Sequence, residues 1–566
     1  MKAAFYAATF VATLVVSQIA YAADADVIYY NGKVLTADRA FSIKSAIAIK
    51  NGKILAVGGD EVTREYTAPQ KIDLKGRVLM PGFTDTHVHI FSLSRRQIVL
   101  EDASSIKQIQ ERLRAKAAEL GPGEWITGYG WDEAKFAEKR NITAADIDAA
   151  VPNNPVNLTR AGSHSNVSNG LALKLAKVGR GTPDPKGGLI EHDAKGEPNG
   201  IVREFNYTTP LVPRDTWDEL KPGYIRSLRA LTRLGITSFH SASSSIDDEP
   251  VGAGGVANPG TGLTIKRFQE IHKETNGTTP RVTAYISYPG PERLAAYPHH
   301  SGDGDEWVRV GAIGENAVDG GFTGPTAWLL ADYKGLPGFR GKGQYTEAEL
   351  QAMVDDSARH GWQMGLHAIG DAAIEQTIRV YSKAIHSIVG KDKDHRWFTD
   401  HFTIMPPEAT MKTMADDHII AAAQPNFLYN LEGRYKATLD DERLAHNNPL
   451  ASTLKHGIRM TFGSDNLPIG PLVGLYAAVT RKGPSGEVLG AAEAISREQA
   501  IHAYTAETAY LSWEENQKGT LEPGKLADMV VLDRDIMTIP PEDILKIKID
   551  LTIIDGKVVY DRGIQS

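Results

Sequence analysis

The sequence predicts an α/β protein, a (β/α)₈ TIM-like barrel with a small β-sandwich built from both ends of the chain. In the middle of the chain, short apolar runs alternate with longer helical stretches, which is typical of βα units. At both ends, β-like runs are joined by Asn31-Gly32, Asn51-Gly52 and Asp555-Gly556. Asn-Gly and Asp-Gly between such runs are the strongest local signal for a hairpin.

The predicted barrel strands divide the chain into domains. The gap between the first two strands is far longer than one helix and is rich in Pro, Gly and Asn, so an insertion is expected at roughly 91–225. The predicted domains are a signal peptide (1–22), a β-sandwich (23–79 and 515–566) and the barrel (80–514). The predicted barrel strands are 78–83, 237–241, 282–287, 308–313, 363–367, 397–401, 419–424 and 459–463.

The composition excludes several classes of function. The formal net charge is −8 and no basic stripe is present, which argues against a nucleic-acid partner. The chain has no cysteine, which excludes disulfides, Cys-ligated zinc and a Cys nucleophile. The expected partner is a small-molecule substrate, and a homo-oligomer is left open.

The first residues resemble a secretory signal. Met1-Lys2 is followed by an apolar run, and Ala20-Tyr21-Ala22 forms an A-x-A cleavage site. The alternative is an uncleaved membrane anchor, but the run is slightly short for a span and lacks a basic stop-transfer flank. We therefore expect cleavage before Ala23, a periplasmic product and no stable membrane anchor.

Two histidines carry the first chemical signal. His87 and His89 follow an apolar run and Pro81-Gly82. Alternate residues of a strand share a face, so both imidazoles can point into the barrel. Two imidazoles on one face suit zinc or a similar divalent ion.

Later strand ends carry matching groups. Glu315 follows the fourth predicted strand, His367 and His401 end the fifth and sixth, and Asp465 follows the eighth. Functional residues of a barrel gather at the carboxyl ends of its strands. Five of eight strand ends with metal-binding or acid–base groups indicate a metal-dependent enzyme.

These motifs resemble the amidohydrolase superfamily, in the branch of formamide deformylase-like proteins (amidohydrolase family 3), over nearly the whole mature chain. The motifs are Pro81-Gly-Phe-Thr-Asp-Thr-His-Val-His89, Gly128-Tyr-Gly-Trp-Asp132, His367-Ala-Ile-Gly-Asp371, Gly463-Ser-Asp465 and Gly519-Thr-Leu-Glu-Pro-Gly-Lys-Leu-Ala-Asp528. The resemblance implies metal ligation by His87, His89, His367 and His401. It also implies that Asp465 ligates metal and shuttles a proton as the catalytic acid and base.

Glu315 departs from the family pattern. Relatives commonly carry a carboxylated Lys four residues before an Asp-Gly, and here Glu315 precedes Asp319-Gly320 by that spacing. A Glu can ligate directly, although it is shorter, and the alternative is a salt-bridge residue. One or two divalent ions are expected, with zinc preferred and manganese, iron and nickel left open.

Residues of the insertion are candidates for substrate binding. His164 could polarise a carbonyl or bind an anionic group, or else belong to a helix-capping cluster; Trp131 could form an apolar wall or a core contact. Arg160 begins the segment that contains His164. His240 is expected to face the barrel mouth without ligating metal. Asp371 is a candidate for orienting a metal ligand.

The preferred function is hydrolysis of a C–N bond in an amide, formamide or cyclic amide by metal-activated water. Lactone or other ester hydrolysis uses the same machinery. A metal-assisted decarboxylase or lyase is a second class. A non-catalytic regulatory protein is a third, which the presence of a proton shuttle at Asp465 disfavours.

Overall fold

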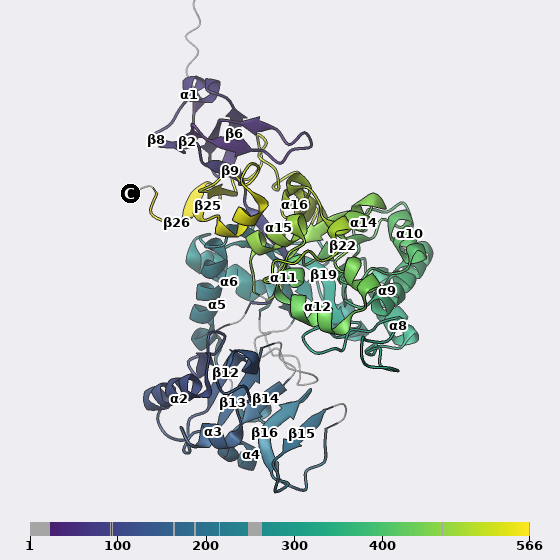
Figure 1. Cartoon of the computed structure of the whole chain (residues 1–566). Helices are drawn as coiled ribbons and strands as arrows, with labels where there is room; N and C mark the ends of the chain where they lie inside the picture. Colours follow the sequence, from purple (N-terminus) through teal and green to yellow (C-terminus); the bar gives the residue numbers. More distant parts are fainter. Residues whose placement is uncertain are drawn as a thin grey trace, which may run out of the picture.

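The computed structural model describes residues 23–90, 92, 94–161, 165–185, 188–213, 215–246, 263–466 and 468–564. It contains a central barrel, two small sheets near the chain ends and an inserted sheet (Figure 1). The predicted signal peptide, residues 1–22, and His164 lie outside the described residues. Among the described residues, no helix is long and apolar enough to cross a membrane.

Eight strands pair in sequence order to form the central sheet, each parallel to its neighbour. Together with the family relationship reported below, this confirms the predicted TIM-like barrel. The strands are β10 (Phe83–Val88), β17 (Ile236–Ser244), β18 (Arg281–Ile286), β19 (Val308–Ala317), β20 (Met364–Ala368), β21 (Phe398–His401), β22 (Ile420–Ala423) and β23 (Met460–Phe462).

Helices connect these strands, as βα units require. Many begin with a capping side chain, such as Thr216, Thr264 and Thr346, whose hydroxyl accepts a hydrogen bond from the first turn. The helices are α5 (Trp217–Thr232), α6 (Ile265–Thr275), α7 (Pro291–Ala296), α8 (Glu347–Arg359), α9 (Asp371–Ala384), α10 (Glu408–Asp416), α11 (Asn426–Asn430), α12 (Glu432–Thr438), α13 (Asp441–Ala445), α14 (Leu450–Lys455), α15 (Pro471–Thr480), α16 (Arg497–Ala503) and α17 (Ala506–Leu511).

The first barrel strand begins later than predicted. We expected it at 78–83, but β9 (Val78–Pro81) pairs with β24 (Met529–Leu532) in a small sheet, and only β10 enters the barrel. Gly82 separates the two strands, and a Cβ at this position would lie 2.2 Å from Thr237 Cγ2. The close approach of barrel strand β17 therefore requires glycine where the chain passes from one sheet to the other.

The N-terminal region alone forms one small sheet, in the order β6-β5-β2-β8, and both ends of the chain contribute to a second, in the order β26-β25-β24-β9-β3-β4. They share a buried core that includes Tyr29, Ile47, Leu79, Val531 and Ile553. The domain limits expected here stay a prediction. The elements of this region are β1 (Ala23–Asp24), β2 (Val27–Tyr30), β3 (Lys33–Leu35), β4 (Ile43–Lys44), β5 (Ala46–Lys50), β6 (Lys53–Gly58), α1 (Glu61–Glu65), β7 (Tyr66–Thr67), β8 (Gln70–Asp73), β25 (Ile549–Ile554) and β26 (Lys557–Asp561).

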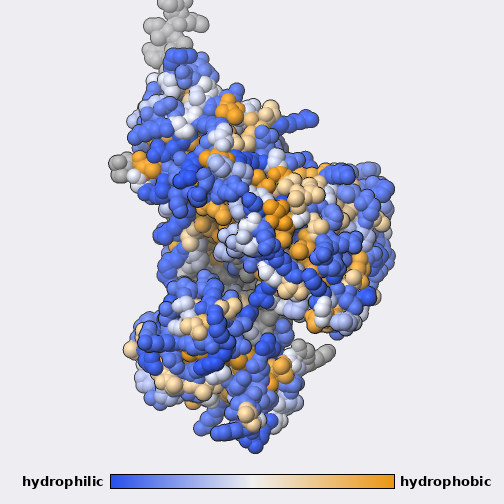
Figure 2. Space-filling model, viewed as in Figure 1, coloured by the Kyte–Doolittle hydropathy of each residue, from blue (hydrophilic) through white to orange (hydrophobic). Residues whose placement is uncertain are grey.

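A separate six-stranded sheet follows β10, in the order β11-β12-β13-β14-β16-β15, and has its own buried core. Figure 1 shows it beside the barrel, on the side away from the small sheets, and Figure 2 shows the surface hollowed between this sheet and the barrel. Its elements are β11 (Gln97–Val99), α2 (Ile106–Leu120), β12 (Ile126–Trp131), α3 (Ala144–Asp148), β13 (Val156–Arg160), β14 (Ser165–Ser168), α4 (Gly170–Leu175), β15 (Leu189–His192) and β16 (Pro198–Arg203).

Candidate metal centre

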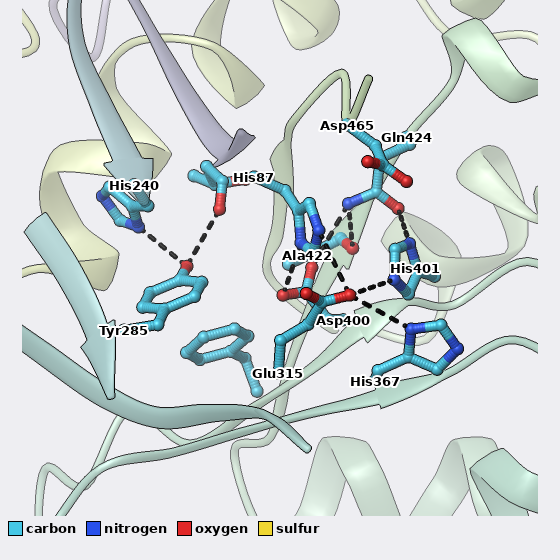
Figure 3. A network of polar contacts seen from close by, with 12 residues as sticks. His87, His240, Tyr285, Glu315, His367, Asp400, His401, Ala422, Gln424 and Asp465 are labelled. Atoms are coloured by element: carbon cyan, nitrogen blue, oxygen red, sulfur yellow. Dashed lines mark hydrogen bonds and ion pairs between the residues drawn. The ribbon is translucent and has the colours of Figure 1, made fainter. Parts of the chain in front are cut away.

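The six residues predicted to bind metal converge at one end of the barrel (Figure 3). Because the barrel strands are parallel, their carboxyl ends meet at the same face. Each side chain comes from or directly follows such a strand end. They are His87 and His89 at β10, Glu315 in β19, His367 in β20, His401 in β21 and Asp465 after β23.

Glu315 lies at the centre of this group. Its Oε1 lies 3.3 Å from His367 Nδ1 and 3.4 Å from both His87 Nε2 and His401 Nε2. Its Oε2 lies 3.3 Å from His89 Nε2. The two carboxylate oxygens thus face different histidines, as a carboxylate shared between two ligand sets would.

Two overlapping sets of donor atoms result. One contains His87, Glu315 and His401, and the other contains His87, His89 and Asp465; within each set the donor atoms lie within 4.8 Å of one another. Asp465 Oδ1 is 3.5 Å from His89 Nε2. The donors are imidazole nitrogens and carboxylate oxygens, which suit zinc and similar divalent ions.

The hydrogen bonding of the histidines fits a bound cation. His401 Nε2 is buried and has no hydrogen-bond partner. His87 Nε2 lies 3.2 Å from His89 Nε2, so two ring nitrogens face each other. Buried ring nitrogens normally have partners, and a cation would satisfy these lone pairs together. The residues present therefore fit a divalent metal.

Electrostatics favour the same interpretation. Burial opposes ionisation of Glu315, but the neighbouring His89 and His87 outweigh it and hold its pKa well below the usual range. Burial also opposes protonation of His87, but Asp400 and Glu315 raise its pKa well above the usual value. The carboxylates thus create a site that stabilises positive charge in a buried position.

Two buried side chains to which the sequence analysis assigned no role, Asp400 and Gln424, support the histidines. Asp400 Oδ2 lies 2.9 Å from His87 Nδ1, and Gln424 Oε1 lies 2.9 Å from His401 Nδ1. Asp400 directly precedes His401, and Gln424 directly follows β22. A polar residue at the end of an apolar strand was the available signal for both.

Asp319, rather than Asp371, lies beside His367. Asp319 Oδ1 is 3.7 Å from His367 Nε2, and its carboxylate accepts hydrogen bonds from three backbone N–H groups. Burial raises the pKa of Asp319 to about 6. Asp371 instead accepts from the N–H groups of Leu330 and Ala372. Asp319 is therefore positioned to orient His367, which is the role that was considered for Asp371.

The site also spans the seam between β23 and β10, which do not pair as neighbouring strands in the described sheet. Asp465 N donates to His87 O at 2.8 Å. The Asn466 side chain accepts from His89 N at 3.3 Å and donates to His89 O at 3.0 Å. Asp85 Oδ1 accepts from Ser464 N at 2.8 Å. These contacts fix Asp465 against the two histidines.

Comparison with known proteins identifies the family. The Amidohydrolase family matches residues 70–560. The chain belongs to this family. It is 27% identical over 549 residues to the putative amidohydrolase YtcJ of Bacillus subtilis (strain 168), covering 95% of this chain and 99% of the relative. It is 25% identical over 558 residues to an N-substituted formamide deformylase of Arthrobacter pascens, covering 95% and 98%.

Solved structures agree on the fold of this amidohydrolase. An uncharacterised metal-dependent hydrolase from Pyrococcus horikoshii OT3 aligns with a TM-score of 0.72 and 22% identity, over 91% of this chain and 99% of that chain. A second one, from Pyrococcus furiosus, aligns with a TM-score of 0.67 and 23% identity, over 90% and 99%. These alignments confirm the predicted TIM-like barrel, while the β-sandwich stays a prediction.

Two candidate substrate residues that the structure describes, Trp131 and Arg160, lie outside this cluster. Trp131 is buried in the core of the inserted sheet and stacks on Phe136. Arg160 donates two hydrogen bonds of 2.8 Å to Glu133. His240 is buried in the barrel, with Nδ1 2.8 Å from the Tyr285 hydroxyl, rather than facing the mouth.

Proposed function

We propose that this amidohydrolase hydrolyses the C–N bond of an amide, a formamide or a cyclic amide, using one or two divalent ions, with zinc preferred. The observation that carries the proposal is the pair of overlapping donor sets. Both contain His87, and one of them also contains Asp465. The relative named as a formamide deformylase, similar over 95% of the chain, supports this class of substrate.

His87, His89, Glu315, His367, His401 and Asp465 would hold the ions. A divalent ion there would polarise the substrate carbonyl and lower the pKa of a water molecule. The substrate C–N bond breaks after water has added to the carbonyl carbon. The nitrogen leaves with a proton, so the site needs a group that moves one.

Asp465 is placed to move that proton. Its side chain is 19% exposed, whereas Asp400 on the other side of the histidines is fully buried. It can therefore contact both the water and the substrate. We propose that Asp465 takes a proton from the attacking water and returns it to the leaving nitrogen, as a general base and then a general acid.

Trp131, Arg160 and His164 stay candidates for substrate recognition. Burial raises the pKa of Glu133, but its partner Arg160 and, through space, Arg434 on α12 outweigh this and lower it. That electrostatic coupling supports an arrangement in which this edge of the insertion faces the barrel. We propose that Arg160, whose guanidinium lies 6.0 Å from the ring centre of the buried Trp131, shapes the substrate side of the cleft.

The test compares metal content and turnover. The variant His87→Ala/His89→Ala should lose bound metal and amide hydrolysis while keeping its far-UV circular dichroism. The control is His299→Ala/His300→Ala, which removes two exposed histidines and should behave as wild type. In ¹⁸O-labelled water, the acid product should contain solvent oxygen. A product without the label would point to a lyase, and turnover of lactones alone would redirect the proposal to esters.

We also propose export to the periplasm with cleavage before Ala23. The apolar segment followed by Ala20-Tyr21-Ala22 supports this. Mass spectrometry of the envelope fraction should detect a chain that begins at Ala23. Detection of the intact Met1 chain as the mature form in the cytoplasm would contradict it.

A further inference from the structure

Gln424 connects the supports of two metal-binding histidines. Its side chain is fully buried and follows β22 on the inner side of the barrel (Figure 3). Its Oε1 lies 2.9 Å from His401 Nδ1. Its Nε2 lies 3.2 Å from Asp400 Oδ1 and 3.4 Å from Ala422 O.

The surroundings determine how the amide is oriented. The Asp400 carboxylate and the Ala422 carbonyl can only accept hydrogen bonds, so the NH₂ group of Gln424 must face them. The amide oxygen then faces His401, which must donate from Nδ1–H. A neutral imidazole with its proton on Nδ1 has its lone pair on Nε2. In His401, Nε2 is the atom that faces Glu315.

The same carboxylate determines the proton position on His87. Asp400 Oδ2 lies 2.9 Å from His87 Nδ1, while Oδ1 accepts from Gln424. In the neutral ring, Nδ1–H donates to Asp400 and the lone pair lies on Nε2. In the chain of contacts His87–Asp400–Gln424–His401, every hydrogen bond therefore points toward Asp400, and the histidine at each end turns its Nε2 lone pair toward Glu315.

We propose that Gln424 is a positioning residue of the metal centre, which acts with Asp400 to hold His87 and His401 as Nδ1–H tautomers with Nε2 free for metal. The proposal rests on the metal-dependent function above. Reversing the Gln424 amide would place NH₂ against His401 Nδ1 and oxygen against the Asp400 carboxylate. Partners fixed in this way typically contribute 10–100-fold to metal affinity.

The chain of contacts from His87 through Asp400 and Gln424 to His401, which we call the relay, offers a direct test. Its amide and its carboxylate can be exchanged between positions 424 and 400. Gln424→Glu alone places two carboxylates against each other. Asp400→Asn alone removes the acceptor that orients the Gln424 amide. In the double variant Asp400→Asn/Gln424→Glu, the new amide can accept from His87 and donate to the new carboxylate. That carboxylate can accept from His401, so every donor again faces an acceptor and the net charge is restored, although the central hydrogen bond is reversed.

The measurement is zinc affinity, obtained by titrating the zinc-loaded full chain with a chromophoric chelator. Each single variant should bind zinc about 10–100-fold more weakly than wild type, and the double variant should recover most of that loss. The matched control is Gln363→Leu. Gln363 is also buried before a strand, and its amide donates to the carbonyls of Arg396 and Leu511. The Gln363→Leu substitution should lower the thermal midpoint of unfolding without changing zinc affinity.

Two results would overturn the relay: single variants that bind zinc as tightly as wild type, or a double variant no tighter than the weaker single one. If Gln424→Glu does not fold, Gln424→Leu, which adds no charge, gives the same comparison with wild type. A wild-type chain that binds no zinc or other divalent metal would overturn the metal centre itself. Metal bound equally well by His87→Ala/His89→Ala would do the same, independently of Gln424.

Discussion

Glu315 and Asp465 both present carboxylates to the histidines, but they differ in surroundings. Glu315 contacts four imidazole rings, whereas Asp465 approaches His89 alone among the ion-pair distances of the described site. Asp465 Oδ1 also accepts from Asn466 N at 2.6 Å. This difference predicts that substitution of Asp465 will mainly lower kcat, whereas substitution of Glu315 will mainly lower metal occupancy.

Asp465→Asn should reduce kcat more than metal content. Asn keeps the size and one oxygen but cannot take up a proton at neutral pH, and removing general acid–base catalysis typically costs on the order of 10²–10⁴-fold. Metal per chain is measured by mass spectrometry of the digested protein alongside kcat. Loss of metal in proportion to kcat would instead make Asp465 mainly a ligand.

Glu315→Gln should reduce metal occupancy, because a neutral amide cannot balance the histidines and the ion. Added metal should partly restore the rate. Glu315→Lys tests the departure from the family pattern, since bicarbonate could carboxylate the new Lys and rescue some activity. Full metal and full rate in Glu315→Gln would show that Glu315 is not a ligand.

The residues that converge at the strand ends could be predicted from the sequence, but the contacts that support them could not. His87, His367 and His401 lie at the carboxyl ends of barrel strands, where the functional residues of a barrel gather. Asp400 and Gln424 act through each other, and that contact depends on the alignment of β21 with β22. Both strands are buried along their whole length, so no alternation of polar and apolar residues fixes their alignment in the sequence.

At the scale of elements, the seam between β23 and β10 depends on Asn466. Its amide is hydrogen-bonded to both backbone groups of His89. Asn466→Ala should release that segment and reduce kcat by roughly 10²-fold, since small misplacements near reacting groups cost that much. The thermal midpoint should change little. Wild-type kcat in Asn466→Ala would show that the other seam contacts suffice.

The division of residues 78–88 into two strands was also not predicted from the sequence. The apolar run 78–83 was expected as one barrel strand, but Gly82 lies against Thr237 and the chain passes there from one sheet to another. A glycine inside an apolar run is compatible with a continuous strand or with a break. Only the packing of β17 and β24 on either side decides between them.

Helix α6 carries a buried histidine with a pH-dependent effect on stability. Burial and, less strongly, Arg281 lower the pKa of His272 to about 4. The unfolded chain protonates this residue near 6.5. Its contribution is therefore complete above pH 6.5 and is lost as pH falls toward 4.

The shift corresponds to about 2 kcal/mol of unfolding free energy lost between pH 7 and pH 5. His272→Gln should remove that part of the loss. Thermal midpoints at both pH values measure it, with the difference between wild type and variant as the readout. Equal decreases in the two proteins would show that His272 is protonated equally in the folded and unfolded chains.

At the scale of the whole molecule, Arg281 joins the barrel to the small sheets. It lies in β18, is buried, and donates two hydrogen bonds to Asp528, which precedes β24. Asp528 also accepts from Asp555 N. A buried carboxylate that loses its cation becomes strongly destabilising, so the ion pair couples the two parts.

Arg281→Met should lower the free energy of unfolding by about 3–5 kcal/mol. The matched control is Arg340→Met, whose exposed pair with Asp332 should contribute less than about 1 kcal/mol. Urea unfolding followed by fluorescence compares the two. An Arg281→Met chain as stable as the control would mean that Asp528 finds another partner or is protonated.

Strand β9 lies between β3 and β24. Residues 78–81 therefore cannot pair on one side until residues 529–532 have been synthesised. During synthesis, the first strands leave the ribosome long before their partner exists. The buried side chains of Leu79 and Val34 therefore stay exposed until almost the entire chain has been made. Pairing between distant segments also makes folding slow. A nascent chain that cannot complete its fold early stays unfolded for longer, which is the condition that the proposed export across a membrane would require.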